Sequence, residues 1–333
     1  MRRDILDCTL RDGGYVNNWR FDIETSLSII NGLYESGIRW IEIGIMGKNP
    51  DVGKQTKFSD FSQIKPFLVD RKKDCHYAVM VTTASSDIFE YPFRSDETPD
   101  VIRVAFFKNE IERTISLAKD LIKKGYLVFL QAMATFMYTK DELINLCSII
   151  NETKPYAFYM VDSFSTMFPN DVVEMRDTIL SSLDKKIMFG FHAHNNIQMA
   201  FSNVQQFMED SVERDLLIDS SIYGMGRGAG NVPTELLMMY LNKRYTCSFK
   251  TSIILNLFDN HLKQIYSELP WGYTLPYYLT AVNHINSAWA WYFLNQGIVS
   301  SVDLENALKM VPNEWTYTMV PAIAEEIVKK IKG

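Results

Sequence analysis

Short apolar segments alternate with amphipathic segments along most of the chain. The apolar segments are rich in valine, isoleucine, phenylalanine, tyrosine and methionine, and several are continuous rather than alternating. Such runs are typical of strands that are buried on both faces of a parallel sheet. We predict eight strands, which span Asp4–Thr9, Trp40–Met46, His76–Thr82, Val101–Phe107, Leu127–Ala134, Phe158–Ser163, Lys186–His194 and Leu216–Ile222.

The segments between these strands have helical periodicity. In Ile23–Ser36 the apolar residues recur at the spacing of one helix face, and Gly37 follows as a stop signal. Eight strands with intervening helices over about 240 residues predict a (β/α)₈ TIM barrel. The alternative, a doubly wound sheet, is disfavoured because no GxGxxG sequence follows the first strand. Further helices are predicted over Glu110–Lys124, Asp141–Asn151 and Asp171–Ser181.

The pattern changes after about residue 243. We predict a barrel at residues 1–245 and a helical C-terminal region at residues 246–333. The aromatic side chains of this region exceed what a short helical tail can bury by itself, so we expect it to pack on the barrel mouth or on a second subunit, most simply in a homodimer. Its predicted helices span Ser252–Leu269, Tyr277–Asn295, Val302–Met310 and Ile323–Lys332.

Composition and charge narrow the function classes. Of the 333 residues, 47% are hydrophobic and 22% are charged, which is typical of a globular protein. The net charge of -6 argues against a surface for nucleic acid or anionic lipid, since phosphate binding needs basic residues. No run of 18 apolar residues and no signal-peptide core are present. Four widely spaced cysteines without a CxxC motif indicate a reduced, cytoplasmic protein.

A polar cluster follows the first predicted strand. In a barrel of this type the functional site lies at the C-terminal ends of the strands, where the loops begin. There Arg11 precedes Asp12 and two glycines. The pair could combine a cation for oxyanions with a metal-binding carboxylate, although an Asp-Gly sequence is also common in surface turns.

Two histidines end the seventh predicted strand. His192 and His194 point to the same side because side chains alternate along a strand. With Asp12, they match a metal site of two histidines and one carboxylate, which keeps open positions for substrate oxygens.

A glycine-rich segment, residues 224–231, follows the eighth predicted strand. Its glycines allow close approach of the backbone to a ligand, and Asn231 could reach the metal through its side-chain oxygen. Glu42 lies in an apolar strand and therefore needs a partner, for which Arg11 is the natural choice. Asp162 and Ser163 end the sixth strand and could bind substrate at the pocket wall.

Together these motifs resemble the DRE-TIM metallolyases, a superfamily of metal-dependent lyases and synthases built on TIM barrels. The resemblance covers roughly residues 1–240, and within the superfamily it is strongest to the 4-hydroxy-2-oxovalerate aldolases. Hydroxymethylglutaryl-CoA lyase and isopropylmalate synthase belong to the same superfamily. The motifs are LDCTLRDGG at residues 6–14, WIEIG at 40–44, HAHNN at 192–196 and GMGRGAGN at 224–231.

This resemblance implies a divalent cation, Mn²⁺ or Mg²⁺, held by Asp12, His192 and His194, with Asn231 completing the shell in some members. It also implies that Arg11 stabilises a pyruvate enolate. The expected activity is therefore cleavage of a 4-hydroxy-2-oxo acid, with a 2-oxo acid as the small-molecule ligand. An aldehyde dehydrogenase partner is implied only by the resemblance to the aldolases, which associate with such a partner.

The chain departs from the aldolases at the residue assigned as their base. They carry a histidine three residues after the metal-binding aspartate, where this sequence has Tyr15. A tyrosine hydroxyl is a poor base at neutral pH because its ordinary pKa is about 10. Either Tyr15 is perturbed, a metal-bound water serves as base, or the substrate differs. The stretch 272–277 matches the aldolases' acid-tyrosine segment and nominates Tyr277 as the acid, although Tyr277 could equally be a core aromatic residue.

Three other readings are weighed against the aldolase. A Claisen-condensing synthase that uses acetyl-CoA is disfavoured because Gly14 and Tyr15 replace the Glu-Gln that usually follows the RDG sequence. Hydroxymethylglutaryl-CoA cleavage is disfavoured because the lyase's cysteine is missing from the glycine-rich segment. The third reading is a barrel that binds metal and a 2-oxo acid without catalysis.

Overall fold

The predicted TIM barrel is confirmed by the computed structural model, which describes residues 1–48 and 55–332. In this part of the chain nine strands form one parallel sheet in the order β1-β9-β8-β7-β6-β5-β4-β2-β3, and β1 also pairs with β2. Eight strands therefore close into a barrel, and β3 lies outside the ring beside β2. The strands are β1 (Arg3–Asp7), β2 (Trp40–Met46), β3 (Lys57–Phe58), β4 (His76–Thr82), β5 (Val101–Phe106), β6 (Leu127–Ala132), β7 (Ala157–Asp162), β8 (Met188–Ala193) and β9 (Leu216–Ser220).

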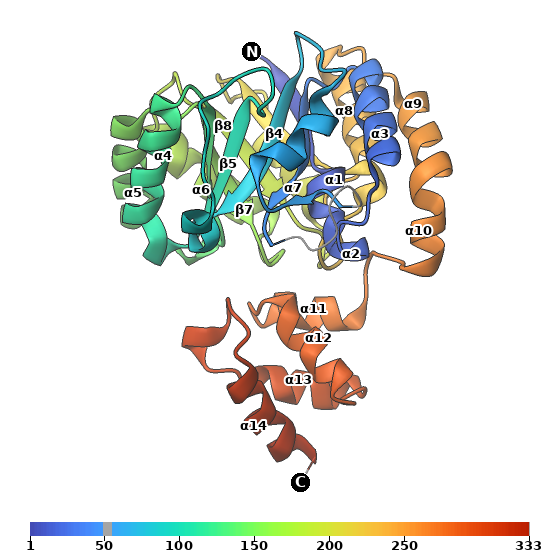
Figure 1. Ribbon diagram of the computed structural model, residues 1–333. Coiled ribbons are helices and arrows are strands. Elements are labelled where there is room, and N and C mark those ends of the chain that lie inside the picture. The colour runs from blue at the N-terminus through green and yellow to red at the C-terminus, as the bar shows by residue number, and fades with distance from the viewer. Residues whose placement is uncertain (49–54, 333) are drawn as a thin grey trace.

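Helices surround the barrel (Figure 1). The first long helix is capped at its start by Asp22, whose carboxylate accepts the Thr25 backbone N–H, and at its end by Gly37, where φ is 106°. Between β3 and β4 a 3₁₀ segment at Phe61–Leu68 takes the place of an α-helix. The barrel helices are α1 (Thr9–Asp12), α2 (Gly14–Asn17), α3 (Ile23–Ser36), α4 (Ile111–Lys123), α5 (Lys140–Thr153), α6 (Pro169–Ser182), α7 (Ala200–Phe207) and α8 (Thr234–Tyr245).

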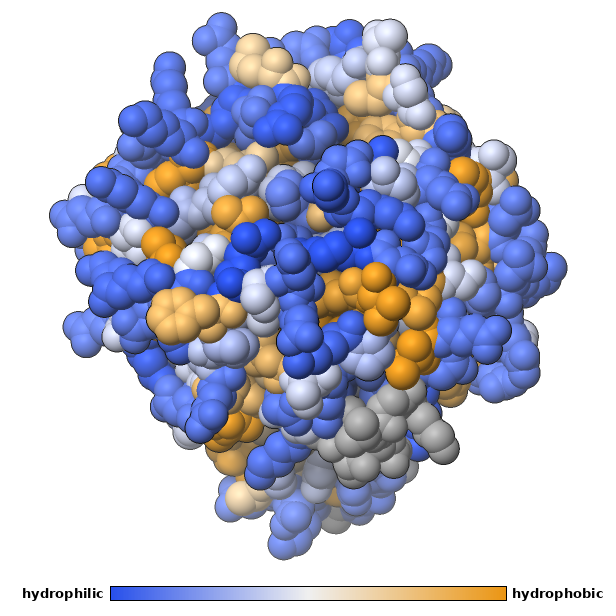
Figure 2. All heavy atoms as spheres, turned by 45° about the horizontal axis from the view of Figure 1, so that its top comes forward, coloured by the Kyte–Doolittle hydropathy of each residue, from blue (hydrophilic) through white to orange (hydrophobic). Residues whose placement is uncertain are grey.

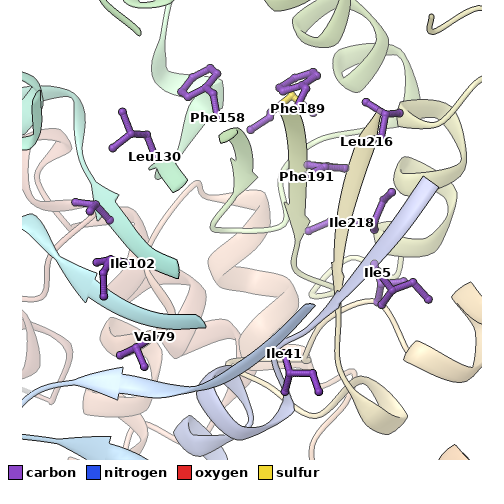
Figure 3. Packing of buried hydrophobic residues seen from close by; sticks show 14 of the residues in the cluster. Ile5, Ile41, Val79, Ile102, Leu130, Phe158, Phe189, Phe191, Leu216 and Ile218 are labelled. Carbon is purple, nitrogen blue, oxygen red and sulfur yellow. The ribbon is translucent and has the colours of Figure 1, made fainter. Parts of the chain in front are cut away.

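The side chains of the strands alternate between the helix layer and the barrel interior. Figure 3 shows strand residues such as Ile5, Ile41 and Phe158, which belong to the main apolar core shared with the helices. Their chain neighbours Leu6 and Trp40 belong to a second cluster inside the barrel. This alternation explains why β8 packs Phe191 among the helices while His192 faces inward.

The helices of the C-terminal region divide between two apolar cores. A continuous helical segment, made of α9 (Thr251–Leu257), a π-helical turn and α10 (Lys263–Glu268), packs on the barrel, and Ile254 and Leu257 join the barrel core. The remaining helices build a separate core beyond the end of the barrel (Figure 1). These are α11 (Leu275–Val282), α12 (Ser287–Asn295), α13 (Ser301–Lys309) and α14 (Pro321–Lys332), and we call them the cap.

The single helix predicted over Tyr277–Asn295 is wrong, because the structure has two helices there. His284 adopts a left-handed φ of 55°, which interrupts the first helix. Asn286 then starts the second by accepting the Ala288 backbone N–H. The division of the chain at residues 245 and 246 stays a prediction.

The two ends of the barrel differ in surroundings. Figure 2 views the molecule from the side of the barrel end at which the strands begin. The surface there is mainly hydrophilic, with scattered apolar side chains. The cap lies at the opposite end, beside α1 and α2 (Figure 1). Among the described residues, no helix combines the length and apolar character needed to cross a bilayer.

Candidate metal centre

Three predicted ligands converge at the C-terminal end of the barrel. One potential ligand atom each from Asp12, His192 and His194 lies within 4.8 Å of the others, and all three residues are buried. The two imidazole rings are nearly perpendicular, with centroids 4.9 Å apart. A buried group of two histidines and one carboxylate suits a divalent cation that also binds substrate oxygens.

The protonation of the histidines fits metal binding. The Nδ1 atom of His192 lies 2.8 Å from Oδ2 of Asp219, so the carboxylate selects the tautomer that leaves Nε2 unprotonated. The Nδ1 atom of His194 is buried and has no hydrogen-bond partner among the described residues. Burial lowers the pKa of His194 to about 3, which keeps this ring neutral as a ligand must be.

Asn231 lies against the carboxylate of Asp12. Its Nδ2 is 2.8 Å from Oδ2 of Asp12, while its Oδ1 is buried without a hydrogen-bond partner in the described part of the chain. Rotation of the amide would turn that oxygen toward the same space, so Asn231 could serve as a further ligand. A Cβ atom at Gly226 would lie 2.3 Å from this Nδ2 and 2.5 Å from Oδ2 of Asp12, so only glycine fits there.

A buried chain of charges connects the two sides of the triad. Arg11 donates to both Asp12 and Glu42, with Nε 2.7 Å from Oε2 of Glu42. Arg103 donates to the same oxygen at 2.7 Å and to Asp219, which also holds His192. Arg103, Glu42 and Asp219 have no solvent exposure. The network therefore couples the position of His192, a candidate metal ligand, to that of Arg11.

Neighbouring charges keep the carboxylates ionised. Burial opposes ionisation of Asp12, but the Arg11 guanidinium and the two histidines hold the pKa of this carboxyl well below its usual range. Burial likewise opposes ionisation of Asp219, but Arg103 and the hydrogen bond from His192 lower its pKa. Both carboxylates are therefore anionic at neutral pH, so that Asp12 can serve as a metal ligand while Asp219 supports His192.

Arg11 keeps one donor for a ligand. Its Nε and Nη1 atoms contact Glu42 and Asp12, whereas its Nη2 is buried without a hydrogen-bond partner among the described residues. The same side chain lines a cavity of about 70 Å³ together with the metal triad. An oxyanion in that cavity would meet a positioned guanidinium donor.

Sequence reasoning missed Arg103 and Asp219, as well as Gln131, whose amide oxygen accepts from Arg103 once the amide is rotated. The signal was available. Arg103 stands alone in an apolar strand, as does Asp219, and the rule that selected Glu42 applies equally to both.

Of the two residues predicted to bind substrate at the end of β7, only Ser163 lines the metal cavity. Its hydroxyl oxygen accepts the backbone N–H of Ala134 at 2.9 Å. The carboxylate of Asp162 instead accepts the backbone N–H groups of Thr166 and Met167. Burial raises the pKa of Asp162 to about 7. The substrate-binding roles of Asp162 and Ser163 stay predictions.

The two predicted catalytic tyrosines lie at the mouth. Tyr15 is 42% exposed and lines both the metal cavity and a larger outer pocket of about 610 Å³. Tyr277, on α11 of the cap, lines the outer pocket only. Burial raises the pKa of Tyr277. The outer pocket lies between the barrel loops and the cap, and Trp271 and Trp291 form part of its wall.

Comparison with known proteins agrees with this architecture. Two relatives are a 4-hydroxy-2-oxovalerate aldolase of Geobacillus thermodenitrificans, 26% identical over 248 residues (72% of this chain, 69% of the relative), and an oxaloacetate decarboxylase of Mycobacterium tuberculosis, 25% identical over 242 residues (72% and 70%). The solved N-terminal domain of a candidate aldolase from Bacteroides vulgatus is 28% identical, with a TM-score of 0.74 over 89% of this chain and 97% of that domain. The HMGL-like family profile matches residues 2–258, so the chain belongs to the HMGL-like family.

Proposed function

We propose that this protein is a divalent-metal-dependent carbon–carbon lyase that cleaves a 4-hydroxy-2-oxo acid through a pyruvate enolate. The observation that carries the proposal is the unpartnered Nη2 of Arg11 in the same small cavity as Asp12, His192 and His194. A cation site beside a free guanidinium donor suits a 2-oxo carboxylate whose carbonyl oxygen gains negative charge during the reaction.

The residues of the network would act in fixed roles. Arg11 would donate to the oxygen that becomes the enolate, and Glu42 would orient Arg11 by accepting its Nε at 2.7 Å. Because Glu42 also accepts from Arg103, we assign it a positioning role rather than a proton-transfer role. Asp12, His192 and His194, with Asn231, would hold Mn²⁺ or Mg²⁺. The bound cation would supply Lewis-acid polarisation of the 2-oxo acid.

Proton transfer would fall to residues at the mouth. Tyr15 borders the metal cavity, where a substrate 4-hydroxyl would lie, and is our candidate for moving its proton. The raised pKa of Tyr277 keeps its hydroxyl protonated, which suits a proton donor. Tyr277→Phe, with Tyr278→Phe as the matched control, would test that role.

The test is a turnover assay on the purified full chain with added Mn²⁺ or Mg²⁺. A panel of 4-hydroxy-2-oxo acids is offered, and released pyruvate is measured with lactate dehydrogenase. We expect release by the wild type and by the exposed control Arg20→Lys, and strongly reduced release by Arg11→Lys. Acetyl-CoA consumption without pyruvate release would favour the synthase reading, and metal binding without turnover would favour the non-catalytic barrel.

The expectations about assembly and location stay predictions. A homodimer would cover exposed aromatic side chains of the cap, of which Trp291 is 65% exposed. An aldehyde dehydrogenase partner rests on the resemblance alone, and a cytoplasmic location rests on the cysteine pattern.

A further inference from the structure

Arg227, in the glycine-rich segment, carries a charge that no carboxylate balances. None of the described carboxylates lies within ion-pair distance of its guanidinium. Its partners are neutral: the amide oxygen of Asn286 accepts from Nη2, and the ring of Tyr15 lies 5.6 Å from the guanidinium carbon. The side chain is half-buried, so this charge is only partly solvated.

The position of Arg227 is fixed from both sides. Its backbone N–H donates to Oδ2 of Asp12 at 3.2 Å, which ties the loop to the metal site. On the cap side, Asn286 is itself held, because it accepts the backbone N–H of Ala288 and donates to the carbonyl oxygen of Tyr317. The guanidinium is therefore preorganised by a neutral acceptor that positions it without cancelling its charge.

Arg227 also lies where the two cavities meet. It lines the metal cavity and the larger outer pocket, as does Tyr15. A substrate whose 2-oxo acid end lies at the metal and Arg11 would have to pass this guanidinium with its other half. The carboxylate of Glu268 also lines the outer pocket, but it lies on an exposed helix end and accepts from Gln264.

A count of the charges in the site shows that the positive charge of Arg227 has no counterpart there. The three network carboxylates Asp12, Glu42 and Asp219 exceed the two guanidiniums of Arg11 and Arg103 by one. A divalent cation would turn this into one positive charge, which the carboxylate of a 2-oxo acid would neutralise. Arg227 would then be a further cation with nothing in the site to balance it.

We propose that Arg227 binds an anionic group, a carboxylate or a phosphate, on the half of the substrate that leaves as the aldehyde. This inference rests on the proposed function and narrows its substrate class to 4-hydroxy-2-oxo acids with a second negative charge. An arginine suits this role because its planar fork pairs with carboxylate and phosphate in bidentate fashion. Arg227 is thus a specificity-determining residue, whereas Arg11 serves the reacting end.

Binding of uncleavable analogues to the Mn²⁺-loaded full chain tests the assignment. The matched pair 2-oxoglutarate and 2-oxovalerate lacks the 4-hydroxyl and differs only in the distal carboxylate. The pair 2-oxoadipate and 2-oxohexanoate extends the chain by one carbon, and 4-phosphono-2-oxobutanoate replaces the distal carboxylate by a phosphonate. Calorimetry should show the analogue with a distal carboxylate binding about 10- to 100-fold more tightly than its monoanionic partner at one chain length at least, as a charge-assisted pair predicts.

Variants then show which residue causes the preference for a distal anionic group. Arg227→Gln should abolish it, Arg227→Lys should keep part of it, and the exposed control Arg20→Gln, which removes the same charge elsewhere, should leave it intact. Circular dichroism and metal content establish that each variant is folded. The relative affinities of 2-oxoglutarate and 4-phosphono-2-oxobutanoate decide between a distal carboxylate and a distal phosphate-like group.

The outcomes separate the two proposals. Equal, metal-dependent binding of the analogues with and without a distal anionic group, at every length, by the wild type would overturn the role of Arg227 and leave the lyase proposal standing. A preference that survives in Arg227→Gln would also overturn it. Failure of pyruvate and all analogues to bind in the presence of metal would overturn the proposed function, and the inference would fall with it.

Discussion

Two parts of the site hold their charged side chains differently. The floor is the buried network around the candidate metal ligands, and the mouth is the region around Arg227 where the metal cavity meets the outer pocket. At the floor, the buried guanidiniums and carboxylates of α1, β2, β5 and β9 pair with one another, and the imidazole of His192 on β8 joins them through Asp219. At the mouth, Arg227 has the amide of Asn286 and the ring of Tyr15 as its partners, and both are neutral. The buried charges are therefore paired with one another, with Nη2 of Arg11 left over as a single donor, whereas at the mouth the whole charge of Arg227 is available for a ligand.

This difference indicates a division of labour. A buried network whose members all depend on one another tolerates little change, because removal of one partner leaves another charge unpaired. A partly solvated cation with neutral partners can exchange them for a substrate group at small cost. We infer that the floor holds the reaction chemistry and that the mouth selects among substrates, so experiments on the two regions should give different kinds of effect.

Truncation of the C-terminal region should have the largest effect on folding and turnover. A chain cut after residue 249 loses Ile254, Leu257 and Leu262 from the barrel core. Each such loss costs about 2–5 kcal/mol, against a typical total stability of about 5–15 kcal/mol. We therefore expect this truncation to aggregate.

A chain cut after residue 272 should behave differently, because it keeps α9, α10 and Trp271 on the barrel and loses only the cap. We expect it to be soluble and to bind metal while turnover falls, as measured by size-exclusion chromatography, metal analysis and pyruvate release. Full activity of the chain without the cap would show that the cap side of the mouth does not contribute to turnover. Insolubility of that chain would show that the barrel and the cap fold as one unit.

Loss of the metal is the next largest effect. The double variant His192→Ala and His194→Ala removes two of the three candidate ligands, so we expect bound Mn²⁺ to fall from near one per chain to background. Inductively coupled plasma mass spectrometry after loading and gel filtration measures this. His261→Ala, on the barrel's outer helix layer, is the matched control. Unchanged metal content in the double variant would move the site elsewhere.

Arg11→Lys should reduce turnover by about 10²–10³-fold while metal content stays near that of the wild type. Lysine keeps the charge but cannot donate to Glu42, to Asp12 and to a ligand with one planar group. Steady-state kinetics and metal analysis on the same preparation separate the two effects. Near-normal turnover would show that the enolate charge is balanced by another group.

Asp219→Asn should have the smallest effect, a loss of about 10- to 100-fold in metal affinity, as is typical for the residue that orients a ligating histidine. The amide keeps an oxygen near His192 but loses the negative charge that balances Arg103. Competition with a metal-sensitive dye measures the affinity, and the exposed Asp70→Asn is the control. An unchanged affinity would mean that the network supports folding without tuning the metal site.

Much of the site could be predicted from single motifs. Strand alternation placed His192 and His194 on one side, and the barrel rule placed them at the same end as Arg11 and Asp12, as the structure has them. Glu42 was paired with Arg11 because a carboxylate in an apolar strand needs a partner, and that contact is present. Arg103 and Asp219 followed from the same rule but were overlooked.

The amino-acid sequence by itself determined the alternation of strands and helices, the closed parallel barrel and the residue types at the strand ends, because these depend on local periodicity and on a topology with few alternatives. Only the tertiary structure decided which distant charges meet. Arg103 bridges Glu42 and Asp219 across the barrel interior, and Asn286 reaches Arg227 from the cap. Such contacts depend on strand register and on the placement of the cap, which arise from packing between segments more than fifty residues apart and leave no periodic signal in the sequence.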